Sequence, residues 1–192
     1  MSRFLWLAVA LLVASCGGKF SPPRDIDDAC AIIRERPSYF TAMKRAEREW
    51  GVPVAVQMAI IYQESKFVGN ARTPHRYALG VIPLGRQSSA YGYSQALDGT
   101  WDEYQAETRS HGARRDRIDD SVDFIGWYMA GSSERLGIEL TDVRNQYLAY
   151  HEGRGGYARG SYRSKGWLQQ IAAQVSSRAE NYHAQLIGCG RA

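Results

Sequence analysis

The feature that most restricts the fold is an apolar run, Val52–Tyr62, which only Pro53 and Gln57 interrupt. Pro53 suits the first turn of a helix, where its missing N–H costs nothing. A helix that is apolar on all sides is normally buried at the centre of a domain. The run ends in Gln-Glu-Ser, so the sequence predicts a buried helix about 18 Å long that carries Glu64 at its C-terminal end.

This position gives Glu64 a predictable chemistry. Partial burial disfavours the ionised carboxylate, and so does the negative end of the helix dipole. Both effects raise the pKa of Glu64, as a general acid working near neutral pH requires. The alternative is a solvated carboxylate paired loosely with Lys66. On this segment alone the structural alternative is the commoner case.

The first sixteen residues have the pattern of an export signal. Arg3 supplies a positive start, and Phe4–Val13 is an apolar run too short to span a bilayer. The segment closes on Val-Ala-Ser-Cys, which resembles the lipobox of bacterial lipoproteins. We therefore predict a signal peptide over residues 1–16 and lipid attachment at Cys16, with a plain secretory signal as the alternative. Gly17 after the cysteine favours the outer membrane.

The remaining cysteines, Cys30 and Cys189, form an even pair in an oxidising compartment. We predict a disulfide that ties the ends of the mature chain together; two free buried thiols are the alternative. Residues 17–29 are rich in Gly, Pro and charge, and indicate a short tether before a domain over residues 30–192. The net charge of +4 is spread along the chain, without the basic block of a nucleic-acid-binding arm.

The rest of the chain predicts one mainly α domain with a loop-rich interruption. Length allows a single sizeable core. Thr100 and Glu103 fit a capping box at the start of a helix. Helical spacing of apolar residues predicts helices over 38–50, 100–110, 117–136, 141–152 and 165–186. Residues 66–93 are punctuated by Gly and Pro, which predicts loops and one small β-hairpin directly after Glu64.

Metal and cofactor chemistry is not indicated. The four histidines are scattered. His151 and Glu152 begin like a zinc-protease motif, but Gly155 stands where that motif needs its second histidine. The glycines that follow Glu152 come after a helix and not after a strand, so they are a weak phosphate loop. We expect no cofactor and no metal.

Three short segments together resemble a known family. They are Glu64-Ser65, Ala90–Ala96 (AYGYSQA) and Ala149–Gly153 (AYHEG). In this order they resemble the lytic murein transglycosylases of the soluble type, relatives of goose-type lysozyme. That family carries Glu-Ser, a Gly-Leu-Met-Gln-like segment, and Ala-Tyr-Asn followed by a glycine. The resemblance covers roughly residues 52 to 157.

The resemblance implies a role for each matching residue. Glu64 matches the catalytic acid, and Tyr150 matches a tyrosine that hydrogen-bonds near it. The residues expected to bind substrate are Ser65, Gly92, Tyr93, Ser94, Gln95, Tyr150 and His151. Two departures stand out: Tyr93-Ser94 replaces Leu-Met, and His151 replaces Asn. His151 is open to a second interpretation, as a cation that caps the C-terminus of its helix.

The resemblance also implies a reaction that needs one carboxylic acid, whereas ordinary glycosidases use two. Glu64 would protonate the glycosidic oxygen between N-acetylmuramic acid and N-acetylglucosamine. Its carboxylate would then take the proton of the muramic C6 hydroxyl, which closes on C1 to give a 1,6-anhydro end. The implied protein is a monomeric, lysozyme-like, lipid-anchored periplasmic enzyme acting on peptidoglycan, without a nucleic-acid partner.

Two other functions fit the same sequence. One is a hydrolytic muramidase, for which a second acid such as Asp98 or Asp102 would have to face the groove. The other is a non-catalytic lipoprotein that binds peptidoglycan without turnover.

Overall fold

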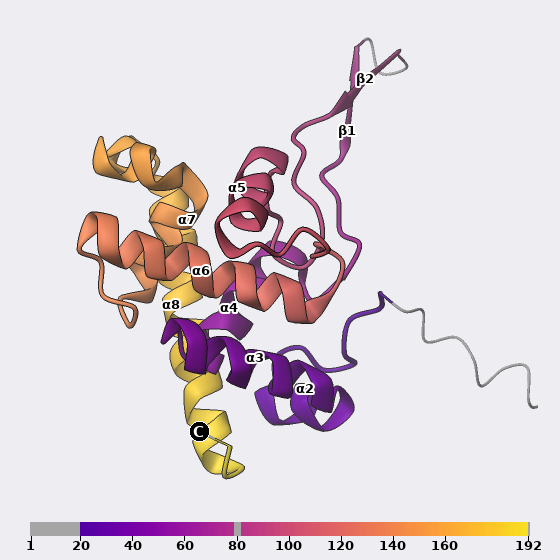
Figure 1. Cartoon of the computed structure of the whole chain (residues 1–192), viewed down its shortest axis with the longest axis vertical. Helices are drawn as coiled ribbons and strands as arrows, with labels where there is room; N and C mark the ends of the chain where they lie inside the picture. The colour runs from indigo at the N-terminus through magenta and orange to yellow at the C-terminus, as the bar shows by residue number, and fades with distance from the viewer. Residues whose placement is uncertain (1–19, 79–81, 192) are drawn as a thin grey trace, which may run out of the picture.

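The computed structural model describes residues 20–78 and 82–191, so the predicted signal peptide and Cys16 lie outside the described residues. Its α-helices are α2 (Ala29–Glu35), α3 (Pro37–Trp50), α4 (Val54–Ser65), α5 (Asp98–Thr108), α6 (Ile118–Leu136), α7 (Val143–Ala158) and α8 (Gly166–Gly188) (Figure 1). A short 3-10 helix, η2 (Ser161–Ser164), precedes α8. The mainly α fold expected from the sequence is confirmed.

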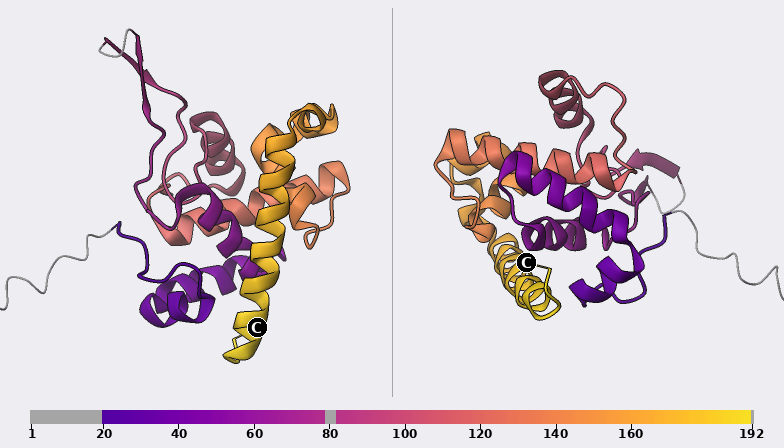
Figure 2. Two further views of the ribbon diagram at one scale, coloured as in Figure 1. Left: turned by 180° about the vertical axis from the view of Figure 1, so that it is seen from behind. Right: turned by 60° about the horizontal axis from the view of Figure 1, so that its bottom comes forward.

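Helix α4 lies at the centre of the helical body, as its composition predicts. It packs against α8, which runs along the length of the body, and it also contacts α3 and α6 (Figure 2). Seven of its first eight residues are apolar and buried, and the exception is Gln57. The Gln57 amide is fully buried and donates to the carbonyls of Met43 (3.0 Å) and Val52 (2.8 Å). A buried amide needs such partners, so these bonds hold α3 and α4 together.

Helices α5 and α6 pack through a cluster of aromatic rings. Tyr104, Phe124 and Trp127 lie within 5.7 Å of one another between ring centroids. Asp123 accepts hydrogen bonds from Trp50 Nε1 (2.8 Å) and from the Tyr104 hydroxyl (2.6 Å). Because both aromatic donors are satisfied, the cluster can be buried without an unpaired polar group.

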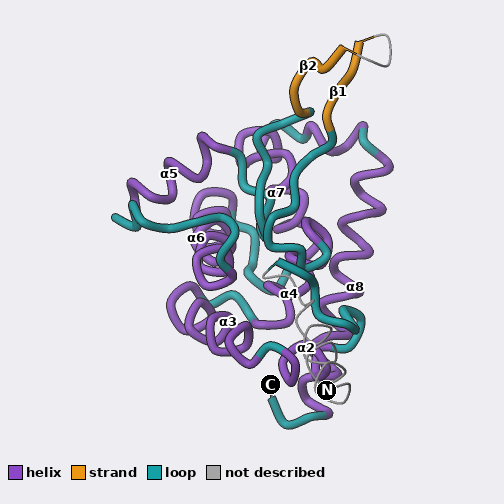
Figure 3. Tube along the Cα trace, turned by 90° about the vertical axis from the view of Figure 1, so that its right-hand side faces the viewer, coloured by secondary structure: helices purple, strands orange, loops and turns teal. Residues whose placement is uncertain are grey.

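A β-hairpin follows α4 and extends away from the helices (Figures 1 and 3). Strands β1 (His75–Ala78) and β2 (Ile82–Arg86) pair antiparallel, with His75 opposite Arg86. The Arg86 guanidinium donates to the Thr73 carbonyl (2.6 Å) at the base of the hairpin. The small β region predicted after Glu64 is confirmed.

Two local predictions need correction, and one is confirmed. Helix α2 was not predicted. Asp28 caps its N-terminus, because the Asp28 side chain accepts hydrogen bonds from the backbone N–H groups of residues 30 and 31. Thr100 does not open α5, because the helix begins at Asp98 and already includes Thr100 in its first turn. Gly153 interrupts the helix that begins at Val143, as predicted. The backbone at Gly153 is non-helical (φ 75°, ψ 153°), and helical structure resumes beyond it to Ala158.

The end of the predicted tether is fixed to α8. Asp27 forms an ion pair with Arg178 (2.7 Å), and its carbonyl accepts from the Gln185 amide (3.1 Å). The Tyr182 hydroxyl donates to the Ile26 carbonyl. These contacts order the chain before α2, so any free tether would end before these residues.

Cys30 and Cys189 are joined by a disulfide, with 6.4 Å between their Cα atoms. The bond connects α2 to the residue after α8, across 159 positions of sequence. It therefore closes a loop that contains almost the whole described domain. In the chain-entropy account, a closed loop of this length strongly restricts the unfolded chain.

Replacing both cysteines by serine should lower the free energy of unfolding by about 2–5 kcal/mol, because the unfolded chain regains the freedom that the closed loop removes. Urea denaturation of the double variant and of the oxidised wild type measures the difference. Mass spectrometry of unreduced peptides from periplasmic material provides the check on pairing. Free thiols at both positions would contradict the disulfide.

Candidate active site

Glu64 stands at the last turn of α4 and opens into a groove of about 390 Å³. Lys66 ends the helix in a left-handed conformation (φ 52°), and its N–H bonds to the Tyr62 carbonyl. The groove has one wall from the segment between the hairpin and α5, and another from α6 and α7. Its lining residues are Glu64, Thr73, Ala90, Gln95, Ala96, Leu97, Thr100, Phe124, Tyr128, Tyr150, His151, Glu152 and Gly153.

The environment of Glu64 makes it a weak acid. Burial raises the pKa of its carboxyl from the ordinary 4.5 to about 7. Two contacts act in the opposite direction and lower the pKa: a hydrogen bond from the Tyr147 side chain and the positive charge of Lys66. Burial is the larger effect, so Glu64 exchanges a proton near neutral pH, as the sequence predicts.

Tyr147 is a site residue that the sequence interpretation missed. It lies on α7, is 3% exposed, and gives the hydrogen bond to Glu64. Tyr150 was expected near the Glu64 carboxyl. Burial raises the pKa of Tyr150, and the nearby charge of Glu64 raises it further. Its hydroxyl, however, donates to the Ser94 carbonyl (2.7 Å). The two tyrosines are three positions apart on one helix and share a face, which is the only signal the sequence offers for Tyr147.

The segment that includes Gly92 and Tyr93 is held from behind by the loop before α6. Gly92 has φ +80°, and a Cβ there would lie 1.9 Å from the Arg115 carbonyl oxygen, so only glycine fits. The Tyr93 N–H donates to the same carbonyl (3.1 Å). The Tyr93 side chain is buried, with its hydroxyl 2.8 Å from that of Tyr39. Tyr93 thus fills the core beneath the wall.

The predicted substrate-binding residues therefore fall into two groups. Gln95, Tyr150 and His151 line the groove together with Glu64. The others, Ser65, Gly92, Tyr93 and Ser94, are buried and are not among its lining residues. Within the described structure these four act as supports: Ser65, for example, donates its hydroxyl to the Ile61 carbonyl one turn back in α4 (3.1 Å).

A second carboxylate in the groove, Glu152, is firmly ionised. Its oxygens accept from Lys165 Nζ (2.7 and 2.9 Å) and from the Ser161 hydroxyl, and His151 Nδ1 lies 3.1 Å away. The hydrogen bond from Lys165, followed by that from Ser161, lowers the pKa of Glu152 to about 2. A carboxylate with such a pKa is a poor base near neutral pH.

His151 lies two residues before the helix break at Gly153. Its ring packs edge-on against Trp167 (5.4 Å between centroids), which is 53% exposed. These contacts place His151 in the groove wall, between Glu152 and an exposed tryptophan.

The acids named for a hydrolytic alternative lie elsewhere. Asp98 pairs with Arg115 (2.7 Å), and neither Asp98 nor Asp102 is among the residues that line the groove. Across residues 20–78 and 82–191, no group of three or more His, Cys, Asp or Glu side chains is arranged to hold a metal ion. In the same part of the chain, no helix is both long enough and apolar enough to cross a bilayer.

A mainly α body with a groove beside the end of a buried helix is the architecture of a lysozyme-like protein. The sequence matches the family model described as Transglycosylase SLT domain over residues 4–189, and the chain belongs to this family of soluble lytic transglycosylases. A search of curated proteins finds no match. Proteins of this family break glycosidic bonds of peptidoglycan in the periplasm.

Tyr147→Phe should move the alkaline limb of the pH–activity profile to higher pH. The substitution removes a hydrogen bond that stabilises the ionised Glu64, so the pKa of the carboxyl rises and its protonated form persists to higher pH. The measurement is kcat/KM for soluble glycan strands between pH 5 and 9.

Tyr157→Phe is the matched control. Tyr157 lies on the same helix, and its hydroxyl also donates, to Asn145 Oδ1 (3.0 Å), but it does not line the groove. This control should leave the limb in place. An alkaline limb that stays in place in Tyr147→Phe would show that this hydroxyl does not influence the titrating group.

Proposed function

We propose that the protein is a lytic transglycosylase in which Glu64 is the only acid–base group. The observation that carries the proposal is the pair of carboxyls in the groove: Glu64 has a pKa of about 7, while Glu152 is ion-paired and has a pKa of about 2. One group can hold a proton at neutral pH, and the other cannot. A reaction that needs a single carboxyl, used first as acid and then as base, fits this arrangement.

The bond changes balance without water. Protonated Glu64 gives its proton to the glycosidic oxygen between N-acetylmuramic acid and N-acetylglucosamine as the bond from C1 to that oxygen breaks. The carboxylate then removes the proton of the muramic C6 hydroxyl, and O6 forms the new bond to C1. Glu64 ends protonated, as it began, and the product carries a 1,6-anhydro end.

The groove supplies polar and aromatic surfaces for the sugars. Gln95 is itself fixed, because its amide donates to the carbonyls of Ala71 (3.0 Å) and Gly92 (2.8 Å). The rings of Phe124, Tyr128 and Tyr150 give the opposite wall an apolar face on which a pyranose can pack. Rigid walls of this kind hold a substrate in a reactive geometry at little entropic cost.

Glu64→Gln should abolish cleavage. It preserves the shape of the side chain and removes the proton that is transferred. A positioned acid–base group contributes about 10²–10⁴-fold, and because one residue performs both transfers, the loss should reach or exceed the upper figure. Digestion of purified sacculi followed by mass spectrometry tests this. The wild type should release anhydromuramic ends, each one water lighter than a hydrolysed end.

The other functions predict different results. Reducing ends from the wild type would identify a muramidase, and tight sacculus binding without any cleavage would identify a binding protein. Full activity in a folded Glu64→Gln protein would exclude Glu64 as the acid.

The same variant also tests the raised pKa of Glu64 through the pH dependence of folding stability. Because the folded protein holds the Glu64 proton more tightly than the unfolded chain, wild-type stability falls as the pH rises from 4.5 to about 7. The loss is at most about 3 kcal/mol and is complete above that range. Glu64→Gln should lack this decrease.

We also propose that Cys16, which lies outside the described residues, carries the lipid that holds the enzyme at the outer membrane. The sequence Val-Ala-Ser-Cys at the end of the predicted signal peptide supports this. Cys16→Ala should release the protein from membranes, because a short tether offers no second anchor. Fractionation after a high-salt wash is the measurement. A variant that still pellets with the outer membrane would show that lipid is not the main attachment.

A further inference from the structure

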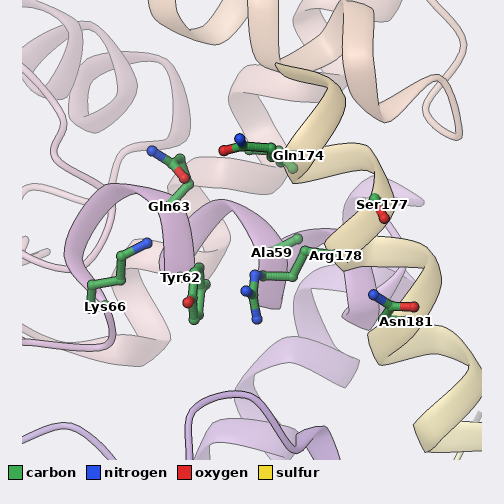
Figure 4. Close-up of a pocket in the computed structure, with 9 residues that line it drawn as sticks. Ala59, Tyr62, Gln63, Lys66, Gln174, Ser177, Arg178 and Asn181 are labelled. Carbon is green, nitrogen blue, oxygen red and sulfur yellow. The ribbon is translucent and has the colours of Figure 1, made fainter. Parts of the chain in front are cut away.

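A second cavity, of about 360 Å³, lies between α4 and α8 and shares no lining residue with the Glu64 groove (Figure 4). Tyr62 and Gln63 of α4 line it together with Lys66, the residue after α4. Gln174, Arg178 and Asn181 line it from α8. Its lining is thus made largely of amide and cationic side chains. Side chains of these types recognise anionic and amide-bearing ligands.

Two cations share one aromatic ring in this cavity. Lys66 Nζ lies 3.7 Å from the centroid of the Tyr62 ring, and the Arg178 guanidinium carbon lies 3.3 Å from it. Figure 4 shows Tyr62 between them. Contact with the ring favours each cation, but the two charges repel each other. Burial and the charge of Arg178 both lower the pKa of Lys66.

The charges are only partly neutralised. Asp27 pairs with Arg178 (2.7 Å) from outside the cavity. In the described part of the chain, Lys66 has no salt-bridge partner, and Asp27 and Glu64 act on it only as more distant charges. The cavity therefore keeps about one unit of positive charge to offer a ligand, since Asp27 offsets one of its two cations.

The cavity and the groove are lined by neighbouring residues of α4. Gln63 and Glu64 are consecutive residues, so their Cα atoms are about 3.8 Å apart, and their side chains point into different hollows. A peptide attached to a sugar in the groove extends by up to about 3.5 Å per residue. Three residues of such a peptide cover about 10 Å, more than twice the separation of the Gln63 and Glu64 Cα atoms.

We infer that this cavity binds the peptide stem of peptidoglycan through one of its carboxylates, an inference that rests on the proposed function. Lys66 and Arg178 attract the carboxylate. The amides of Gln63, Gln174 and Asn181 both donate and accept, which suits the backbone of a peptide. A phosphate group would use only the donors, so the amide-rich lining favours a peptide over a phospholipid headgroup.

Gln174→Glu is the variant that tests the cavity. It keeps the shape of an exposed side chain, retains the Lys66 side chain, and places a negative charge in the cavity. Gln170→Glu is its matched control: the same substitution, one turn earlier in α8, at an exposed residue outside the cavity.

The first measurement is KM for glycan strands that carry peptide stems and for the same strands after an amidase has removed the stems. Gln174→Glu should raise KM about five- to tenfold for the peptide-bearing strands, as expected for one like charge at close range. It should leave KM for the bare strands unchanged. Gln170→Glu should change neither. An equal KM for both substrates in all three proteins would overturn the inference.

The second measurement separates this inference from the proposed reaction. Binding of free stem peptide to the non-cleaving Glu64→Gln protein is followed by calorimetry, with the peptide in its acid and carboxyl-amidated forms. The acid form should bind, and amidation or Gln174→Glu should weaken binding. Peptide binding without cleavage by the wild type would refute only the proposed reaction. Absence of peptide binding, or binding only to anionic phospholipid vesicles, would refute the peptide site.

Discussion

The structure depends on one unfavourable placement: a carboxyl at the C-terminal end of a helix buried on nearly all sides. Burial and the helix dipole both oppose ionisation of Glu64, and the Tyr147 hydrogen bond and Lys66 offset only part of the effect. Such a carboxyl can persist only where the surrounding fold is stable enough to hold it. Packing of α4 against α3, α6 and α8 supplies that stability. The apolar run that fixes the fold is therefore also what sets the acidity of Glu64.

The groove walls are fixed from outside the groove. Arg115 lies in the loop before α6. Its backbone carbonyl accepts from the Tyr93 N–H, and its side chain donates to the carbonyls of Ser89 (3.1 Å) and Ala96 (2.9 Å). One residue thus holds both ends of the segment that carries Gln95. The position of Arg115 also explains why residue 92 must be a glycine, because the Arg115 carbonyl occupies the space that a Cβ would need.

The sequence predicts those features that depend on composition or local periodicity. The centre of the fold follows from the apolar run before Glu64, and the hairpin follows from the Gly and Pro residues after it. Helix α2 was missed because it adjoins a charged, Gly/Pro-rich stretch, and its stability comes from contacts with α8 more than 150 residues away. The roles of Tyr147 and Tyr150 could not be separated, because both lie on one helix face and only the distances between side chains decide which hydroxyl reaches Glu64.

The presence of Glu152 in the same groove shows how the surroundings, and not residue type, assign chemistry to a carboxyl. Glu64 faces one hydroxyl donor and a more distant cation, whereas Glu152 receives two bonds from Lys165 and one from Ser161. The kink at Gly153 and the turn of η2 bring these donors, from just before α8, back onto α7. As a result the two carboxyls titrate far apart, one near neutrality and one in strong acid. Of the two carboxyls in this groove, only Glu64 can exchange a proton near neutral pH, which is the physical basis for proposing a mechanism with a single carboxylic acid.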